Sequence, residues 1–320
     1  MALRIGSLEN KKLALGSWAI VYLNIALVVF LSLTRENFLT GNSIISILYD
    51  TSFSYFAAIG FTMLIIMGEL DLSVGAVYGF GGSMMALFIF TYKVPAGTAI
   101  ILAMLTAGLV GLAAGFLVVK FRLNSMMVTI GFMMAVRGAS SILVNRFAGR
   151  QFPMSARAFM SFNVFGIRWT IVLMVVSAII LEVFLYKSRH LKQLYYIGQN
   201  AQTASIYGLN TNQIKVICFI VSAMFSAFGG CLVASRLAHP NVSYGQGLEM
   251  SIITAAVLGG ASIYGGRGSM VRTMLGTLFV FILQKGMVAY KVDSFIQHVV
   301  MGVILVVVIL VDVRMNQKRN

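Results

Sequence analysis

Apolar stretches of about 20 residues recur along most of the sequence, and short polar segments separate them. An α-helix needs about 20 apolar residues to cross the hydrocarbon core of a bilayer. Within that core, every backbone amide must find its hydrogen-bond partner inside the protein, which a single segment achieves only as a helix. The pattern therefore predicts an all-α polytopic membrane protein with one domain over residues 1–320.

The composition supports this fold class. Only 10% of the 320 residues are charged and 59% are hydrophobic, whereas a soluble domain carries about 25% charged residues. The net charge of +15 does not indicate nucleic acid as a partner, because the basic residues lie in short clusters between apolar stretches. Cytoplasmic loops of membrane proteins have this pattern, so lipid is the expected surrounding.

We expect about ten membrane-spanning helices. The eighth is too short to cross as delimited, so it either starts near Tyr244 or is a broken helix. Residues 42–49, before the second span, are amphipathic enough to lie at the membrane interface. The predicted spans are residues 13–33, 52–68, 74–90, 98–119, 126–143, 169–186, 212–235, 250–260, 270–290 and 295–311.

The loop charges predict the orientation. With ten spans, both termini lie on one side, which collects fourteen Lys and Arg residues against eight on the other side. Because cytoplasmic loops are enriched in Lys and Arg, both termini are predicted to be cytoplasmic. Residues 145–168 are an exception, since this outside loop carries four arginines.

Motifs for catalysis are absent from the sequence. It contains neither a G-x-x-x-x-G-K-[ST] phosphate loop nor an H-E-x-x-H metal motif, and its three histidines are scattered. We therefore expect no catalytic residues, no metal site and no bound cofactor. Cys218 and Cys231 lie in one apolar segment without the spacing of metal ligands or a redox pair, so we interpret them as packing residues.

The predicted cytoplasmic loop at residues 187–211 contains a short helix with two end signals. Asn200 can cap a helix over residues 201–207, and Gly208 can supply a left-handed stop. A short capped helix would offer a rigid surface to a soluble partner. An ordinary connection between two spans explains the same pattern equally well.

Two further breaks between spans carry polar or glycine-rich sequence. In residues 68–75, Glu69 and Asp71 could bind a cation, or Asp71 or Ser73 could cap the next helix. Residues 257–269 hold too many glycines for a helix interior and suit a tight re-entrant turn packed in protein. Residues 259–266 share outer glycines and a central polar–aliphatic pair with residues 68–75, which hints at duplication.

These three segments resemble the motifs of the membrane permeases of ribose, arabinose, xylose and autoinducer-2 ATP-binding-cassette importers. The family reads G-G-I-D-L-S-V-G at residues 68–75, I-G-G-N-x-x-A-A-x-x-x-G-I at 197–209, and Q-G-x-E-L-D-x-I-x-A-V-V-L-G-G-x-S-L-x-G-G-x-G-S at 246–269. The order and spacing match from about residue 38 to 312. The sequence departs from the pattern at Glu69, Gln199, Gln202, Thr203 and Ser251.

The resemblance implies a ten-span, type II importer-like permease of a bacterial inner membrane that pairs with a second copy or a paralogue. Cassette ATPase subunits, which bind the ATP, would dock on the loop at about residues 187–211. A soluble binding protein would deliver a sugar or sugar-like solute from outside. The implied coupling residues are Gly198, Asn200, Ala201, Ala204, Ser205 and Gly208. Candidates for the pathway or its gating are Asp71, Ser73, Arg137, Glu249, Gly259, Gly260, Ser262, Gly265 and Gly266.

Arginines at unusual positions suggest two further roles. Arg137 lies near the middle of a span, where a guanidinium must be paired or face the protein interior, and we expect backbone carbonyls as its partners. The outer arginines can bind carboxylates through a two-point fork, so we predict contacts with acidic residues of the binding protein. The alternatives are that the loop is only solvated or that its arginines contact anionic lipid headgroups. These arginines are Arg146, Arg150, Arg157, Arg168 and Arg236.

Two other functions fit parts of the sequence. Ionisable residues within spans favour an ion-coupled secondary transporter, and Arg137, Glu182 and Lys285 meet that description in part. Glu182 and Lys285 lie near helix ends, however, where long side chains reach the interface. A membrane scaffold without transport activity is the third hypothesis, because glycine-rich faces fit helix packing in all three.

Overall fold

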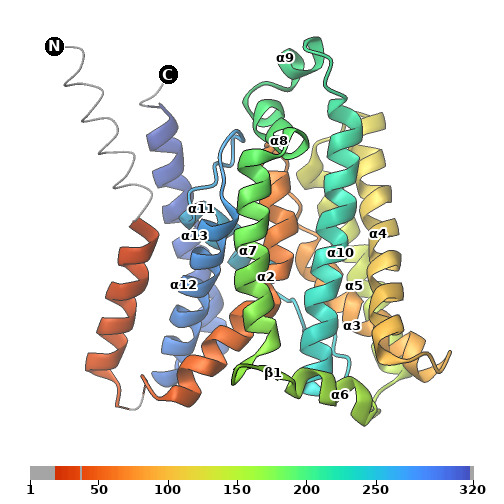
Figure 1. Ribbon diagram of the computed structural model, residues 1–320, viewed down its shortest axis with the longest axis vertical. Helices are drawn as coiled ribbons and strands as arrows, with labels where there is room; N and C mark the ends of the chain where they lie inside the picture. Colours follow the sequence, from red (N-terminus) through yellow and green to blue (C-terminus); the bar gives the residue numbers. More distant parts are fainter. Residues whose placement is uncertain (1–18, 37, 318–320) are drawn as a thin grey trace.

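The computed structural model describes residues 19–36 and 38–317, and this part of the chain is almost entirely helical (Figure 1). The elements are a first helix, Ala19–Thr34, followed by α2 (Gly41–Ile66), α3 (Val74–Phe90), α4 (Ala96–Lys120), α5 (Ser125–Arg146), α6 (Met154–Ser161), β1 (Asn163–Val164), β2 (Ile167–Arg168), α7 (Trp169–Lys187), α8 (Arg189–Gln199), α9 (Ala201–Ile206), α10 (Thr211–Leu237), α11 (Leu248–Leu258), α12 (Met270–Ala289) and α13 (Ser294–Gln317).

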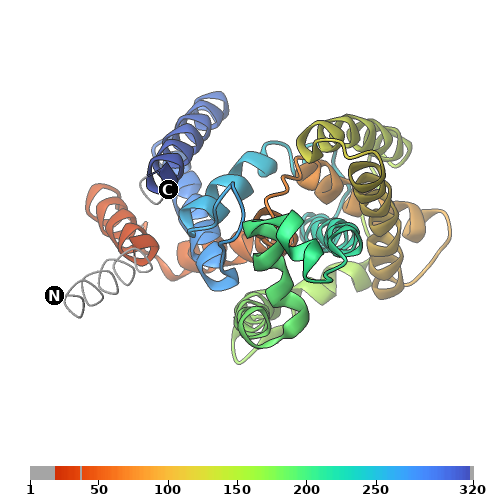
Figure 2. The same ribbon diagram turned by 90° about the horizontal axis from the view of Figure 1, so that it is seen from above.

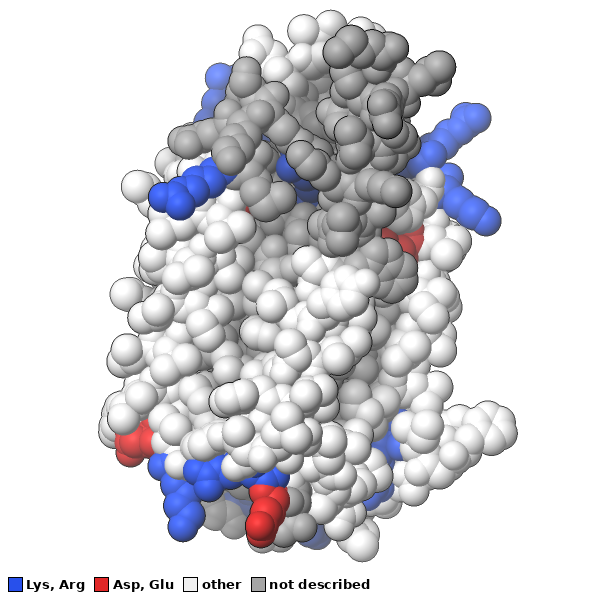
Figure 3. All heavy atoms as spheres, turned by 90° about the vertical axis from the view of Figure 1, so that its left-hand side faces the viewer, with Lys and Arg blue, Asp and Glu red and all other residues white. Residues whose placement is uncertain are grey.

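Seven of the described helices are long and apolar enough to cross a membrane, namely α2, α4, α5, α7, α10, α12 and α13. Three shorter apolar helices, Ala19–Thr34, α3 and α11, correspond to the other predicted spans. On the face shown in Figure 3, the described charged side chains lie toward the two ends, and an uncharged band separates them. Because charge is costly in hydrocarbon, this arrangement is that of a multi-pass membrane protein.

The structure defines two segments that the sequence left open. Residues 42–49, which were expected to lie at the interface, form the first turns of α2. Helix α2 starts early because the hydroxyl of Thr40 accepts a 3.3 Å hydrogen bond from the amide of Ser43. The eighth apolar segment is a helix of 11 residues that does not extend back to Tyr244, because Gly245 and Gly247 have positive φ angles. The predicted start of the first span, residue 13, lies outside the described residues.

Helix α2 forms the centre of the structure, and every residue from Thr51 to Ile66 is buried. Helix α10 packs against α2, α3 and α4. Glycines permit this close approach, because a Cβ atom on Gly230 of α10 would overlap the backbone carbonyl of Tyr78 on α3. In the view from above, the first helix and α13 lie on one side of the molecule, and α4 and α5 lie on the opposite side (Figure 2).

The two ends of the helical bundle carry different short elements (Figure 1). Helices α8 and α9 lie at one end, which we call the α9 end. Helix α6 and the antiparallel hairpin β1–β2, in which Asn163 lies opposite Arg168, lie at the other end, which we call the α6 end. The loop that carries the anomalous arginines therefore contains secondary structure of its own.

The contact at Gly230 predicts a specific stability effect. Gly230→Ala should lower the free energy of unfolding by about 1–3 kcal/mol, because the added methyl group forces α10 away from α3. Gly138→Ala on α5 is the matched control, since a Cβ there meets no atom within 4 Å and alanine is the better helix former by about 0.5–1 kcal/mol. Thermal unfolding of each purified variant in detergent measures both changes in stability. Equal melting temperatures for the two variants would contradict the packing described here.

Candidate functional site: a polar pocket and a glycine junction

A pocket with a cavity volume of about 440 Å³ opens between α2, α3 and α10 on one side and α11, α12 and α13 on the other. None of the described residues that line it is an Asp, Glu, Lys or Arg. The pocket therefore offers hydroxyl, amide and imidazole groups as donors and acceptors without a carboxylate, ammonium or guanidinium charge. Its polar side chains belong to Ser54, Tyr78, Ser243, Tyr244, Gln246, Ser251, Gln284, Ser294, Gln297 and His298.

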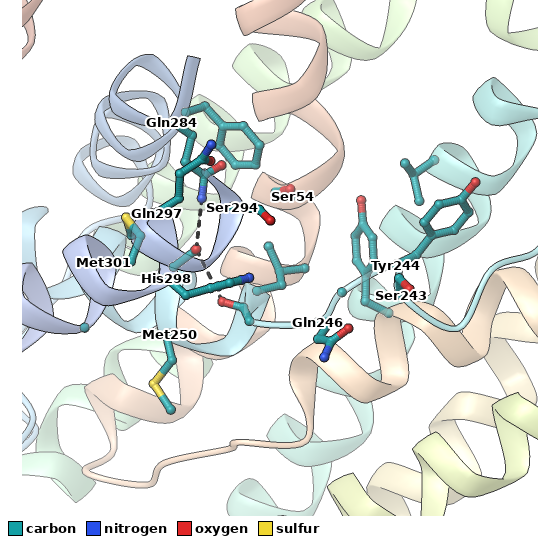
Figure 4. A pocket seen from close by; sticks show the side chains of 18 residues that line it. Ser54, Ser243, Tyr244, Gln246, Met250, Gln284, Ser294, Gln297, His298 and Met301 are labelled. Carbon is teal, nitrogen blue, oxygen red and sulfur yellow. Dashed lines mark hydrogen bonds between the residues drawn. The ribbon is translucent and has the colours of Figure 1, made fainter. Parts of the chain in front are cut away.

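The polar groups of the pocket come from two sides (Figure 4). Gln284 lies on α12 and donates a 3.3 Å hydrogen bond to the hydroxyl of Ser251 on α11. Gln297 lies on α13 and donates to the carbonyl of Val292 at 2.9 Å. Across from them, burial raises the pKa of the Tyr244 phenol, so this hydroxyl stays protonated at neutral pH.

The sequence analysis did not identify the residues of this pocket. The available signal was weak: Gln284 is an uncharged polar residue inside an apolar span, and Gln297 lies in the first turn of another. Single amides of this kind also occur in structural roles. Only the packing of α11, α12 and α13 around one cavity shows that the side chains of Gln284 and Gln297 line the same pocket.

Two pathway candidates, Arg137 and Glu249, form an ion pair. The Arg137 guanidinium of α5 donates to Glu249 Oε1 of α11 at 2.8 Å, so its partner is a carboxylate and not the backbone carbonyls we expected. Glu249 is buried, and its Oε2 has no hydrogen-bond partner among the described residues. The absence of a side chain on Gly75 leaves space for this carboxylate. Glu249 lies between Leu248 and Met250, which both line the pocket.

The acidic residues between α2 and α3 have partners within the protein. Asp71 is buried, and its Oδ1 accepts hydrogen bonds from the amide and the hydroxyl of Ser73 at 2.9 and 2.6 Å. Its Oδ2 accepts from Ser222 of α10 at 3.3 Å. Ser73 occupies the N-cap position of α3, but its side chain makes no capping hydrogen bond; Asp71 holds this N-cap residue through its amide and hydroxyl. Glu69 forms an ion pair with Lys215.

Residues 259–268 form the predicted re-entrant turn between α11 and α12. Gly260, Gly265 and Gly266 have φ angles of +85°, +86° and +73°, which side chains with a Cβ atom rarely adopt. Gly259 lies close to the backbone of Arg272, where a Cβ would be 2.7 Å from the carbonyl carbon. Buried Ser262 donates to the Asp312 carboxylate of α13 at 3.3 Å.

The other ionisable residues that favoured ion coupling also have structural partners. The Glu182 carboxylate of α7 accepts hydrogen bonds from the Met270 amide at 2.6 Å and the Ser269 hydroxyl at 2.8 Å. It therefore caps the N-terminus of α12, where negative charge is favourable. Lys285 donates to the hydroxyl of Ser46 at 3.2 Å.

The three sequence motifs meet at one point of the structure. The amide of Gly266 donates to the carbonyl of Ile66, at the end of α2, at 2.8 Å. A Cβ on Gly198 of α8 would overlap that same carbonyl oxygen, and a Cβ on Gly265 would lie 2.7 Å from the Gly198 oxygen and 2.9 Å from the Gly68 nitrogen. We call Gly68, Gly198, Gly265 and Gly266 the glycine junction. It also brings together the two segments that echo each other in the sequence.

The predicted short helix is α9, and both of its end signals are confirmed. Asn200 accepts a 2.8 Å hydrogen bond from the Thr203 amide, and Gly208 has a φ angle of +83°. One coupling candidate does not face a partner, because Ala204 is buried against the protein. The exposed apolar residues are instead Ile206 and Tyr207, which are 78% and 82% exposed. Ala201 and Ser205 lie on the same helix.

The five outer arginines form two groups. Arg157, Arg168 and Arg236 line one cavity beside Tyr49. Arg236 forms an ion pair with Asp50 and lies 4.4 Å from the centre of the Tyr49 ring, so its charge already has a partner. The other two arginines, Arg146 and Arg150, do not line this cavity.

The second group comprises Arg146 and Arg150, which are exposed. Their guanidinium groups lie over the rings of Phe147 and Phe90, at 5.7 and 5.4 Å from the ring centres. Among the described residues, neither arginine has a carboxylate within salt-bridge distance. Of the five, these two are the ones that are both exposed and not paired with a carboxylate.

Comparisons with known proteins show the family of the chain. The chain is 31% identical over 301 residues to the probable ABC transporter permease protein YphD of Escherichia coli K12, covering 94% of this chain and 90% of that protein. It is also 31% identical to the L-arabinose ABC transporter permease AraH of Azospirillum brasilense (94% and 88% covered) and to the ribose import permease RbsC of Bacillus subtilis 168 (89% of each covered). Residues 43–309 match the family described as branched-chain amino acid transport system / permease component. The chain belongs to this permease family.

Proposed function

We propose that this chain is the membrane permease subunit of an ATP-binding-cassette importer for a neutral polar solute, a sugar or a sugar-like molecule. The polar pocket carries this proposal, because its described lining offers hydroxyl, amide and imidazole groups and no carboxylate, ammonium or guanidinium. A sugar presents many hydroxyl groups, which exchange hydrogen bonds with such a lining. The relatives named for arabinose and ribose transport support the same solute class.

In this proposal the chain crosses a bacterial inner membrane ten times, with the α9 end in the cytoplasm and the α6 end outside. Cassette ATPase subunits, which bind the ATP, contact α9. A soluble binding protein contacts the α6 end, and a second permease copy or a paralogue completes the pathway. The distribution of positive charge supports this orientation, since fourteen Lys and Arg residues fall on the side of the chain termini.

An ion-coupled mechanism gains no support from the ionisable residues considered for it. Arg137 is paired with Glu249, Glu182 caps α12, and Lys285 is hydrogen-bonded to Ser46. Each of these charges therefore has a partner within the protein. An importer that draws its energy from a separate ATPase needs no ion site in its membrane subunit.

The pocket assignment predicts a loss of transport without a loss of fold. Gln284→Leu keeps the side-chain volume but removes the amide, so uptake should fall about three- to tenfold, the equivalent of one hydrogen bond. Uptake of radiolabelled D-ribose and L-arabinose into proteoliposomes that contain the complete transporter measures this. Gln213→Leu, an exposed residue near the start of α10, is the control. If Gln284→Leu and Gln297→Leu both transport at the wild-type rate, the pocket is not on the pathway.

The exposed end of α9 predicts where the ATPase binds. Tyr207→Asp places a charge on an exposed apolar surface and should abolish co-purification of the cassette ATPase with the tagged permease. Phe165→Asp is the matched control, because Phe165 is fully exposed at the tip of the hairpin on the α6 end. Retained co-purification in Tyr207→Asp would exclude this surface as the docking site.

The exposed arginine group predicts the contact with the binding protein. Reversing both charges, Arg146→Glu with Arg150→Glu, should weaken binding-protein affinity for the reconstituted transporter. It should also flatten the dependence of that affinity on salt concentration, because screened attraction between opposite charges is lost. Arg189→Glu reverses one charge on the α9 end and should leave both quantities unchanged. An unchanged affinity and salt dependence in the double variant would show that these arginines do not face the binding protein.

A further inference from the structure

We propose that the glycine junction is a rigid link that makes α9, the end of α2 and the turn between α11 and α12 move as one body, with Gly198 as its positioning residue. This inference rests on the proposed function, because it assigns the route by which an ATPase bound at α9 acts on the polar pocket. Three sets of contacts, which lead from α9 to the pocket, support this inference.

The first step joins α9 to α8 without a flexible residue between them. Asn200 lies between the two helices and caps both of them: its amide donates to the Tyr196 carbonyl of α8 at 3.1 Å, and its side chain accepts from the Thr203 amide of α9 at 2.8 Å. Gly208 lies on the far side of α9, has a positive φ angle and would meet no atom within 4 Å at its Cβ position. Freedom to bend is therefore found after α9 and not before it.

The second step fixes α8 to the junction. At Gly198, α8 lies against the carbonyl of Ile66 and the amide of Gly266, which are hydrogen-bonded to each other. One turn earlier, the Tyr195 hydroxyl donates to the Gly268 carbonyl at 2.9 Å. Burial, together with the nearby Tyr186 and Glu182, raises the pKa of this phenol, so it remains a donor at neutral pH.

The apolar side of α8 strengthens this attachment. Leu194 and Ile197 are 1% and 2% exposed, and both belong to the main apolar core, which also contains Ile66 of α2. Backbones in direct contact leave no layer of mobile side chains that could absorb a displacement. A shift of α8 must therefore displace the end of α2 and the turn with it.

The third step leads from the junction to the pocket. The turn at residues 259–268 continues into α11 on one side and α12 on the other, and both helices line the pocket. Helix α2 also reaches the pocket through Ser54. Helix α13 is tied to the same turn, because Asp312 accepts hydrogen bonds from Ser262 and from the Ile263 amide at 3.3 Å. Three helices that line the pocket therefore lead into the junction or the turn that holds it, and α13 is hydrogen-bonded to that turn.

The decisive experiment measures the number of solute molecules transported per ATP hydrolysed by the complete reconstituted transporter. Gly198→Ala should leave the ATPase subunit bound, because α9 itself is unchanged, but lower this ratio at least about fivefold. The added methyl group separates α8 from Ile66 and Gly266. Gly138→Ala, whose Cβ lies in open space, should keep the wild-type ratio.

A second variant keeps the test informative if Gly198→Ala folds poorly. Tyr195→Phe removes only the hydrogen bond to Gly268 and should lower the same ratio about two- to threefold, with ATPase binding unchanged. A wild-type ratio in either well-folded variant would overturn the rigid link. Failure of the wild-type chain to bind any cassette ATPase would instead overturn the proposed function.

Discussion

The structure depends on direct contact between helix backbones. Lipid tails are as apolar as leucine side chains, so helices in a membrane gain little from the hydrophobic effect and associate through close packing. Helix α2 is surrounded on this basis: a Cβ on Gly60 would overlap the backbone of Ser222 in α10, and Gly230 of α10 meets α3 in the same way. The buried position of α2 fixes where its two ends lie, and the glycine junction forms at one of them.

Non-helical backbone inside such a protein needs partners of its own, because lipid supplies none. Between α2 and α3, the amides of Leu70 and Leu72 donate to the hydroxyls of Ser125 and Thr129 in α5 at 3.2 and 3.1 Å. Between α11 and α12, Asp312 accepts from an amide of the turn and Glu182 from an amide at the helix start. These acidic and hydroxyl side chains therefore act as substitutes for water around broken helices.

Features that arise from neighbouring residues could be predicted from the sequence. The apolar helices, the cap at Asn200, the stop at Gly208 and the glycine-rich turn each depend on a few adjacent side chains. The number of membrane crossings stays a prediction, because helices such as α11 are shorter than a bilayer requires. The pair of Arg137 and Glu249, the split of the arginines and the inward direction of Ala204 depend on how distant helices pack. No local pattern encodes that packing.

The glycine junction also limits how a chain of this kind can vary through evolution. Residues 68, 198 and 265 are far apart in the sequence, yet a methyl group on Gly265 would require space that backbone atoms of the other two occupy. A mutation that adds a side chain at residue 265 therefore forces the backbone at residues 68 and 198 to move, and no single second mutation restores the contact. Substitutions at these three positions are therefore expected to be constrained together during evolution, although the positions lie in separate stretches of the sequence.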